Sequence, residues 1–461
     1  MPLLLFSIIL YLLLTLLLGF WASRRVKNAG DFMLAGRSLP LALSTAALFA
    51  TWFGSETIFG ASSEFLKGGL YAVIEDPFGA ALCLLLFGMF FARRLYHMNL
   101  LTLGDFFRNR FGKKAELLAS ILMVPSYFGY TAGQLVALGL ILNVVAGIPL
   151  WQGVVVSSLV VTLYTAVGGM WAVSVTDFLQ SMAIVLGLTI LAVVLAGKAG
   201  GAMRVIQEVP AGTFRFLPDG NFTDVLGYLA AWSVLGLGSI PSQDVFQRAM
   251  SSGSSQIAVR SCYYAAGLYL SVALLPLFIS LCVKHLYPDQ VNGDTQLTLP
   301  SMVLQHTGLP VQILFFGSLM SAILSTTSSS VLAPAAILSE NIIKPLLAKP
   351  LPERHFLLVT RVSVLLFSAG ATVLACVKTD IYKLVGDSSV FSLVSLFVPL
   401  TLGLYWRRFT APGALAAMVT GMLAWIWFRW YPVSVPALVP ALALGFAAAV
   451  LISLLFPERG H

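Results

Sequence analysis

Six hydroxyl side chains follow one another from Ser325 to Ser330, inside an apolar stretch long enough to cross a bilayer. On a helix, Ala322, Ser325, Thr326 and Ser329 would share one face, because they are spaced three and four residues apart. Hydroxyls and freed backbone carbonyls are hard oxygen ligands without a full charge, which suits a sodium ion that must both bind and leave. A single hydroxyl in a membrane helix usually bonds its own backbone or tightens a helix contact, so this prediction depends on the whole cluster.

A second apolar span, 41–66, carries Gly54 and Glu56 near its middle. Lipid cannot satisfy backbone N–H and C=O groups, so a glycine beside a carboxylate at this depth favours a helix that unwinds where protein or a solute can satisfy it. A tightly packed helix crossing at the glycine is the alternative. If the helix unwinds, carbonyls next to Ala50 and Phe53 would complete the oxygen shell of the hydroxyl cluster.

Acidic side chains within apolar spans are costly, and by default they are functional candidates. Asp177 lies near the start of an apolar span, where it has a functional role or is an interfacial acid favoured by the helix dipole. Glu75 and Asp76 precede Pro77, so they cap a helix restarted at the proline, attract a cationic substrate group or couple protons. Glu56 has the same ambiguity, since it could instead pair with a helix terminus.

Aromatic and polar side chains near these positions are candidates for solute contacts. Trp52 usually would pack against lipid or helices, but beside a solute it could stack or hold a quaternary ammonium by cation–π attraction. The predicted substrate-binding set is Trp52, Glu56, Glu75, Asp76, Tyr130, Gln134, Ser242 and Gln243. The sequence contains no P-loop, metal-ligand cluster, nucleophile elbow or ATPase motif, so it predicts neither an enzyme nor coupling to nucleotide hydrolysis.

The composition indicates a protein of the lipid bilayer. Hydrophobic residues make up 58% of the chain and charged residues 10%, whereas soluble globular chains have about 25% charged residues. The first apolar run, 2–23, is predicted to be a retained helix and not a signal peptide, because Arg24 and Arg25 follow it. The net charge of +8 then reflects basic loops on one membrane face and not nucleic-acid binding.

Thirteen spans are expected, at 2–23, 41–66, 69–92, 115–147, 150–168, 171–197, 224–247, 257–283, 308–342, 356–377, 381–405, 411–428 and 434–456. The seventh contains Gly236, Gly238 and Pro241, which favour a second interrupted helix. Carriers are often built from inverted repeats whose binding site lies between two such helices. We therefore expect a single transmembrane domain, 1–461, with an extra helix and loop at 1–40, repeats at 41–197 and 224–405, and two C-terminal helices at 411–456.

Lysine and arginine residues indicate how the chain crosses the membrane. With the N-terminus outside, the inside loops hold 18 of these residues and the outside loops hold seven. Cytoplasmic loops are the richer ones, so we expect an outside N-terminus and a cytoplasmic C-terminus in the inner (cytoplasmic) membrane of a cell. The inside set includes Arg25, Lys27, Arg248, Lys349 and Arg459.

Three stretches of the chain resemble the sodium:solute symporter family, and the resemblance covers nearly the whole length. Gly168-Gly169 with Thr176-Asp177 and Gln180 resembles the GG…TD..Q signature of the family, residues 321–326 resemble its sodium-site helix, and residues 104–111 resemble its connector. The resemblance implies an all-α integral membrane protein of the LeuT-type 5+5 inverted-repeat fold, with about 13 transmembrane helices. It also implies sodium-driven uptake by alternating access.

The family resemblance also implies ligands for sodium. The main sodium site would consist of the backbone carbonyls of Ala50, Phe53 and Ala322 and the hydroxyls of Ser325 and Thr326. Members with a second sodium ion place it beside the aspartate that matches Asp177. Sodium is therefore the expected coupling ion, and a second sodium ion at Asp177 is a hypothesis.

Within the family, the chain is most similar to the high-affinity choline transporter branch, in the stretches 50–52, 162–165 and 246–248. Where that branch reads Gly-Ile-Pro-Trp-Gln, residues 239–243 read Ser-Ile-Pro-Ser-Gln, so Ser242 replaces part of the aromatic cage that choline recognition needs. Glu75 and Asp76 also replace uncharged residues of that branch. The predicted solute is a cationic or quaternary-amine compound, and an amino acid, sugar or carboxylate is the alternative.

The sequence as a whole predicts a sodium-coupled symporter that imports a small organic solute. A non-transporting sensor with the carrier fold and a passive channel are the alternatives. Sensors usually append a signalling domain, whereas only about five residues follow the last expected span. The sequence predicts no particular oligomeric state.

Overall fold

The computed structural model describes residues 2–24, 26, 28–291, 295–347 and 352–457. Regular structure in these residues is helical, apart from an isolated bridge between Leu39 and Ser252. Four basic residues of the predicted inside set lie outside the described residues, namely Arg25, Lys27, Lys349 and Arg459.

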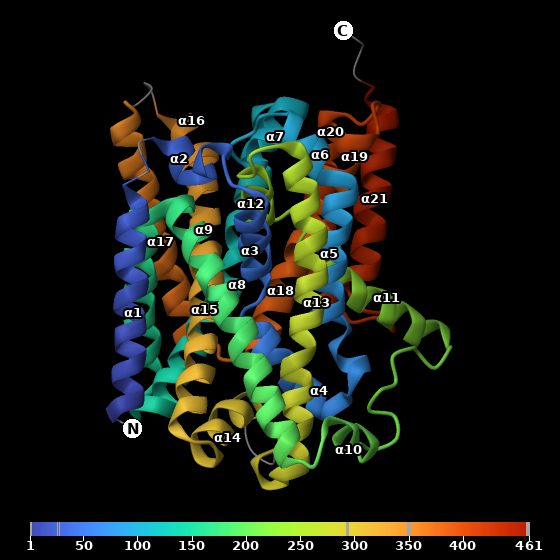
Figure 1. Cartoon of the computed structure of the whole chain (residues 1–461). Coiled ribbons are helices and arrows are strands. Elements are labelled where there is room, and N and C mark those ends of the chain that lie inside the picture. The colour runs from blue at the N-terminus through green and yellow to red at the C-terminus, as the bar shows by residue number, and fades with distance from the viewer. Residues whose placement is uncertain (1, 25, 27, 292–294, 348–351, 458–461) are drawn as a thin grey trace.

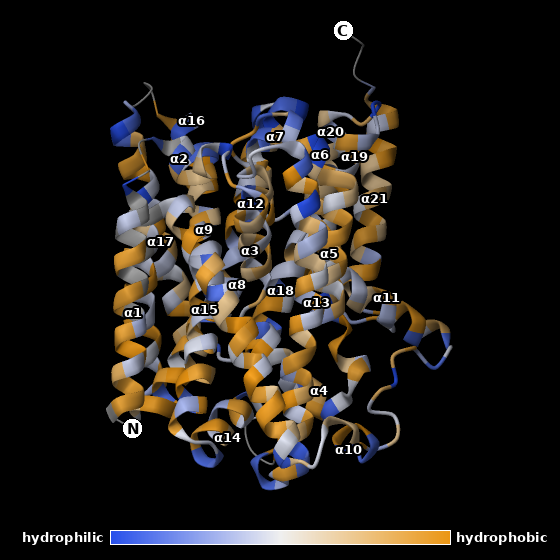
Figure 2. Cartoon of the chain, viewed as in Figure 1, coloured by the Kyte–Doolittle hydropathy of each residue, from blue (hydrophilic) through white to orange (hydrophobic). Residues whose placement is uncertain are grey.

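The helices run between two opposite faces of the molecule (Figure 1). Hydrophobic residues dominate the middle of the helices, and hydrophilic residues gather at both ends (Figure 2). Within the described part of the chain, nine helical segments are long and apolar enough to cross a bilayer. This distribution is that of a multi-pass membrane protein, as the composition predicts.

In the described residues the helices follow one another without intervening sheets. Their bounds are α1 (Pro2–Ser23), α2 (Ala29–Leu34), α3 (Leu41–Trp52), α4 (Ala61–Gly68), α5 (Ala80–Leu86), α6 (Ala92–His97), α7 (Leu103–Phe111), α8 (Lys113–Ala146), α9 (Leu150–Lys198), α10 (Ala202–Gln207), α11 (Phe222–Gly236), α12 (Gln243–Met250), α13 (Ser255–Leu286), α14 (Thr298–His306), α15 (Leu309–Ile337), α16 (Lys344–Leu346), α17 (Glu353–Val377), α18 (Ile381–Ser392), α19 (Val398–Tyr405), α20 (Ala411–Trp430) and α21 (Leu438–Leu455). Short π-helical segments extend several of them, namely η2 (Glu56–Gly60), η4 (Ile74–Gly79), η5 (Phe87–Phe91), η8 (Leu338–Ile343) and η9 (Leu393–Phe397).

Both predicted interruptions are present. The helix α3 ends at Trp52, Phe53 leaves the helix with φ −86° and ψ 80°, and helical structure resumes in η2. We call residues 53–55 the first break. The helix α11 ends at Gly236 and α12 begins at Gln243, so residues 237–242 form the second break. A side chain supports the first break, because Gln134 Oε1 accepts a hydrogen bond from the Ser55 N–H at 2.9 Å.

The predicted fifth and sixth spans form the two halves of α9, which changes direction at Gly169. Gly169 has a φ of +54°, a conformation that favours glycine. A Cβ atom at this position would also lie 2.6 Å from the ring of Phe32 in α2. Glycine is therefore required both by the turn and by the close approach of α2, and the turn sets the direction of the half of α9 that carries Asp177.

The two breaks lie in the centre of the bundle because long helices surround them. The helix α15 packs against both α8 and α9, and α3 packs against α9 and α13. The helix α18 packs against α8, while α20 pairs with α21 and covers η9. The helix α1 packs against α9 and α15.

Candidate functional site

The oxygen atoms predicted to bind a cation converge where the first break meets α15. Thr326 Oγ1 lies 2.9 Å from the carbonyl oxygen of Ala50, 3.3 Å from that of Phe53 and 3.1 Å from that of Ala322. Ser325 Oγ lies 3.4 Å from the Ala50 carbonyl oxygen, and all five residues are buried. One hydroxyl hydrogen on Thr326 can serve only one of its three acceptors, so this oxygen cluster has lone pairs to spare for a cation.

A buried ion pair lies beside the oxygen cluster. Asp177 Oδ1 accepts a hydrogen bond from the Ser325 hydroxyl, and Asp177 Oδ2 lies 3.7 Å from Arg248 Nη2. Arg248 also donates from Nε to the Ala47 carbonyl at 3.1 Å and from Nη2 to the Ser329 hydroxyl. The prediction that Arg248 lies in an inside loop is wrong, because these acceptors hold its fully buried guanidinium within the bundle.

The ion pair joins α9, α12 and α15 at one point. A carboxylate in such a place needs an opposite charge, since desolvation of an isolated ion costs several kcal/mol. Arg248 supplies that charge beside the oxygen cluster. The rule that identified Asp177 as a candidate, a charged residue within an apolar span, could also have identified Arg248.

A cavity lies between the two breaks, with about 460 Å³ of empty space that includes space open to solvent. We call it the substrate cavity. It is lined by Trp52, Glu56, Ser126, Tyr127, Tyr130, Leu235, Gly238, Ser239, Ser242, Asp244, Val385, Ser388, Ser389 and Ser392. These residues come from the second break and from α3, η2, α8, α11, α12 and α18, and Trp52 and Glu56 flank the first break on either side. Of the predicted substrate residues, Trp52, Glu56, Tyr130 and Ser242 lie here.

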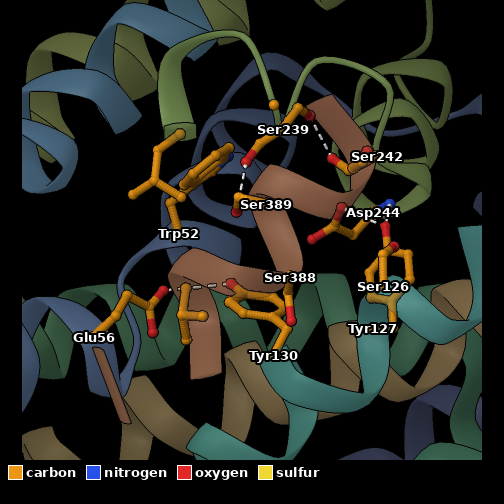
Figure 3. Close-up of a pocket in the computed structure, with 14 residues that line it drawn as sticks. Trp52, Glu56, Ser126, Tyr127, Tyr130, Ser239, Ser242, Asp244, Ser388 and Ser389 are labelled. Atoms are coloured by element: carbon orange, nitrogen blue, oxygen red, sulfur yellow. Dashed lines mark hydrogen bonds between the residues drawn. The ribbon is translucent and has the colours of Figure 1, made fainter. Parts of the chain in front are cut away.

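Two carboxyl groups face the substrate cavity from opposite sides, Glu56 beside Trp52 and Asp244 beside Tyr127 (Figure 3). Asp244 Oδ1 accepts a hydrogen bond from the Tyr127 hydroxyl at 2.8 Å, and the Tyr130 hydroxyl lies 3.4 Å from Glu56 Oε1. The described residues that line the cavity include no Lys, Arg or His. Acidic groups together with aromatic faces are a combination that recognises an organic cation.

Two of the predicted substrate residues, Gln134 and Gln243, do not line the cavity. Gln134 Nε2 donates to Glu56 Oε2 at 2.6 Å, while its other amide atom accepts from the Ser55 N–H at 2.9 Å. Gln243 points away, since its Oε1 accepts from the Leu103 N–H at 2.7 Å. Gln134 therefore positions the Glu56 carboxyl group, and Gln243 ties α12 to α7.

The other two predicted substrate residues, Glu75 and Asp76, lie in η4 and do not line the substrate cavity. Asp76 is fully buried and accepts a hydrogen bond from the Tyr269 hydroxyl of α13. The backbone of Asp76 is extended, with φ −140° and ψ 122°, which interrupts the helical path of η4. Helical spacing therefore does not predict where the two carboxyl groups point.

Several cavity residues lie outside the predicted set. Asp244 stands in the first turn of α12, directly after the second break, and an acid within an apolar span is a signal that could have identified it. The serines of α18 carry no comparable signal, because a serine in a membrane helix most often bonds its own backbone. Ser388 does so, donating to the Leu384 carbonyl at 2.9 Å.

Comparisons with known proteins agree with this geometry. The model of the Sodium:solute symporter family matches residues 32–421. The chain is 30% identical over 441 residues to High affinity choline transporter 1 of Homo sapiens, which covers 91% of this chain and 75% of that protein. It is 28% identical over 459 residues to the High-affinity proline transporter PutP of Bacillus subtilis (strain 168), which covers 95% of this chain and 94% of that protein.

A solved structure with a similar fold is that of a Na+-coupled sialic acid symporter in a substrate-bound outward-open state. The two structures superpose with a TM-score of 0.86 at 19% sequence identity, over 99% of this chain and 98% of that chain. The predicted all-α, LeuT-type fold is thereby confirmed. The number of crossing helices stays a prediction.

Proposed function

The chain belongs to the sodium:solute symporter family, and from this premise we propose that the solute it imports with sodium is a small organic cation, such as a quaternary amine. Members couple the uptake of a small organic solute to sodium, which is the coupling ion here. The observation that carries the proposal is the pair of carboxyl groups facing the substrate cavity, without a cationic side chain among the described residues that line it.

The proposed sodium site is the oxygen cluster of Ala50, Phe53, Ala322, Ser325 and Thr326. A sodium ion there would join the first break to α15, and would stabilise the outward-open state that accepts the solute. Release of sodium inside would loosen this contact and let the protein complete its alternating access. Asp177 is the proposed neighbour of a second sodium ion, within reach of the Ser325 hydroxyl.

The chemistry of the substrate cavity favours a cation over the other solute classes. Trp52 and Tyr130 offer aromatic faces, and Glu56 and Asp244 offer carboxyl groups that would attract an ammonium group. A carboxylate solute would meet like charge and would find no cationic side chain as a partner in the described lining. One relative is named for choline and another for proline, so an amino acid is the second candidate class.

An uptake screen tests the proposed solute. Purified protein in proteoliposomes with an inward sodium gradient should accumulate choline or another quaternary amine, and potassium in place of sodium should prevent the accumulation. Entry should accelerate when the vesicles are preloaded with the same amine, since counterflow distinguishes a carrier from a channel. Sodium-driven uptake of proline, glucose or sialic acid that excess amine does not inhibit would contradict the proposal.

The carboxyl groups of the cavity provide a sharper test. We expect Glu56→Gln and Asp244→Asn each to raise the KM for the transported amine about thirtyfold, the equivalent of roughly 2 kcal/mol of lost charge pairing. Asp387→Asn is the matched control, because Asp387 pairs with Arg429 at 3.0 Å and lies outside the cavity. KM values within about twofold of the control for both cavity variants would refute a cationic solute.

We also propose the predicted topology, with an outside N-terminus, a cytoplasmic C-terminus, repeats at 41–197 and 224–405, and a location in the inner membrane of a cell. Opposite positions of the start of α1 and the end of α21 support an odd number of crossings (Figure 1).

Thiol labelling tests this topology. In a Cys376→Ser background, an impermeant thiol reagent added to whole cells should label Lys378→Cys and spare Lys114→Cys, since both positions are exposed on opposite predicted faces. The reverse labelling pattern would overturn the orientation.

A further inference from the structure

Three side chains form a hydrogen-bonded chain that lies outside both the oxygen cluster and the substrate cavity lining. The Tyr269 hydroxyl donates a hydrogen bond to Asp76 Oδ1. The same hydroxyl lies 2.8 Å from Thr57 Oγ1, which in turn lies 3.4 Å from the carbonyl oxygen of Trp52. Asp76, Tyr269 and Thr57 are fully buried. Among the described residues, Asp76 Oδ2 has no hydrogen-bond partner. We call this arrangement the Asp76 chain.

The surroundings of Asp76 provide no opposite charge. The titratable groups that face it are Glu56 of η2, Glu75 of η4, Tyr269 of α13 and Tyr382 of α18. In the described part of the protein, no Lys, Arg or His is among the groups that act on Asp76. A lone buried carboxylate costs several kcal/mol within a membrane, so this group requires a proton or a cation.

A count of hydrogens indicates which of the two it takes. The Asp76 chain contains three contacts within 3.5 Å, from Asp76 to Tyr269, from Tyr269 to Thr57, and from Thr57 to the Trp52 carbonyl, and the Thr57 hydroxyl also acts on the Asp76 carboxyl group. The two hydroxyls supply only two hydrogens, so one contact goes without a hydrogen while Asp76 is ionised. A proton on Asp76 provides the third hydrogen, and then all three contacts are hydrogen bonds.

We propose that Asp76 is a proton-binding site, and that its occupancy is linked to the first break. The proton comes from water and forms an O–H bond on the Asp76 carboxyl group. The Tyr269 hydroxyl then turns its hydrogen from Asp76 to Thr57, and Thr57 turns its hydrogen to the Trp52 carbonyl. A sodium ion suits the place less well, since it prefers several oxygen ligands and Asp76 Oδ2 has no polar partner among the described residues.

The link to sodium follows from the position of Trp52. Its carbonyl lies directly before Phe53, whose carbonyl belongs to the oxygen cluster. A hydrogen bond from Thr57 fixes the backbone at the start of the first break, so it organises the sodium ligands in advance. Protonation of Asp76 therefore strengthens sodium binding, and by reciprocity sodium strengthens proton binding. If a proton and sodium instead competed for Asp177, acidification would weaken sodium binding.

The apparent sodium affinity at alkaline and at acidic pH tests this link without a solute. The measurement is the sodium-dependent rise in melting temperature of the purified protein, with potassium as the reference salt. In the natural protein the apparent sodium affinity should increase about fivefold on acidification, which is at the lower end of the typical coupling between two binding sites. An affinity that is constant or weaker at acidic pH would overturn the proposal.

Variants of the Asp76 chain locate the effect. Asp76→Asn should bind sodium tightly at both pH values, because the amide donates permanently to Tyr269. Thr57→Val should bind sodium more weakly at both pH values, because the Trp52 carbonyl loses the Thr57 hydroxyl and keeps only the Gly54 N–H, at 3.1 Å. Ser280→Ala, on the same helix as Tyr269 but outside the chain, removes a buried hydroxyl that donates to the Leu277 carbonyl at 2.7 Å and should keep the fivefold change. If Asp76→Asn does not fold, Tyr269→Phe replaces it and should also lose the pH dependence. A pH dependence of the sodium affinity that persists in the variants of the Asp76 chain would overturn the proposal.

Infrared difference spectroscopy tests the proton itself. The carbonyl stretch of a protonated carboxylic acid should appear on acidification of the natural protein and of Thr57→Val, and should be weaker in Asp76→Asn. Glu75→Gln should keep the part of the carboxylic-acid band that comes from Asp76. Identical spectra for the natural protein and Asp76→Asn would refute proton binding. A carboxylic-acid band that disappears when sodium is added at constant pH would assign the site to sodium and overturn the proposal.

Discussion

Replacement of both Ser325 and Thr326 by alanine is expected to abolish sodium-dependent uptake. The double variant removes both proposed side-chain ligands of the oxygen cluster, and hydrogen bonds to charged groups contribute about 1.5–3 kcal/mol each. Two such losses correspond to a decrease in sodium affinity of about a hundredfold or more. The sodium-dependent rise in melting temperature should disappear with the uptake, so the effect can be measured before a solute is known.

The matched control for this variant lies on the same helix. Ser328 and Ser330 are also fully buried, but their hydroxyls donate to backbone carbonyls of α15, at 2.8 Å and 3.0 Å. Ser328→Ala with Ser330→Ala removes two hydroxyls without removing a proposed ligand, so it should retain the sodium response. If the Ser325 and Thr326 variant responds to sodium as this control does, the oxygen cluster is not the sodium site.

Arg248→Met should cause the largest loss of stability of any single substitution proposed for this protein. It leaves Asp177 buried without an opposite charge, and it removes a donor from the Ala47 carbonyl and from the Ser329 hydroxyl. Breaking a buried ion pair by removing one partner costs about 3–5 kcal/mol. We expect a sharp decrease in the yield of monodisperse protein and in melting temperature, measured by size-exclusion chromatography and thermal unfolding.

A second substitution distinguishes charge from packing. Arg248→Met combined with Asp177→Asn removes both charges and should recover much of the lost stability, although it should not restore sodium coupling. Arg260→Met on the exposed side of α13 is the control for loss of an arginine and should unfold like the natural protein. If Arg248→Met is as stable as Arg260→Met, the buried ion pair does not hold α9, α12 and α15 together.

The two breaks and the oxygen cluster could be predicted because membrane spans restrict the choices strongly. A continuous helix in lipid is unfavourable where Gly54 lies beside Glu56. It is equally unfavourable where Gly236 and Gly238 precede Pro241. Once the helices are broken at matching positions, the freed carbonyls need partners, and the hydroxyls at 325 and 326 are the nearest chemical match. The convergence of Thr326 on three carbonyl oxygens confirms that geometric expectation.

The partners of the acidic side chains could not be predicted in the same way. Helical spacing assigns a face only while the helix is regular, and Asp76 and Asp244 lie at irregular backbone, one in an extended residue and one at a helix start. Two adjacent acids were expected in the substrate cavity, and a different acid is found there. The pairing of Arg248 with Asp177 cannot be predicted, because the two residues are on distant segments and no spacing rule connects them.

Six of the side chains around the substrate cavity are serines. The hydroxyls of Ser126, Ser242 and Ser388 donate to backbone carbonyls at 2.7, 2.5 and 2.9 Å, so their oxygen atoms are left to accept hydrogen bonds from whatever lies in the cavity. Under the proposal that Glu56 and Asp244 attract a cation, these serines add neutral acceptors around it. An amine that carries N–H or O–H donors beside its positive charge would therefore suit the proposed site better than one without them.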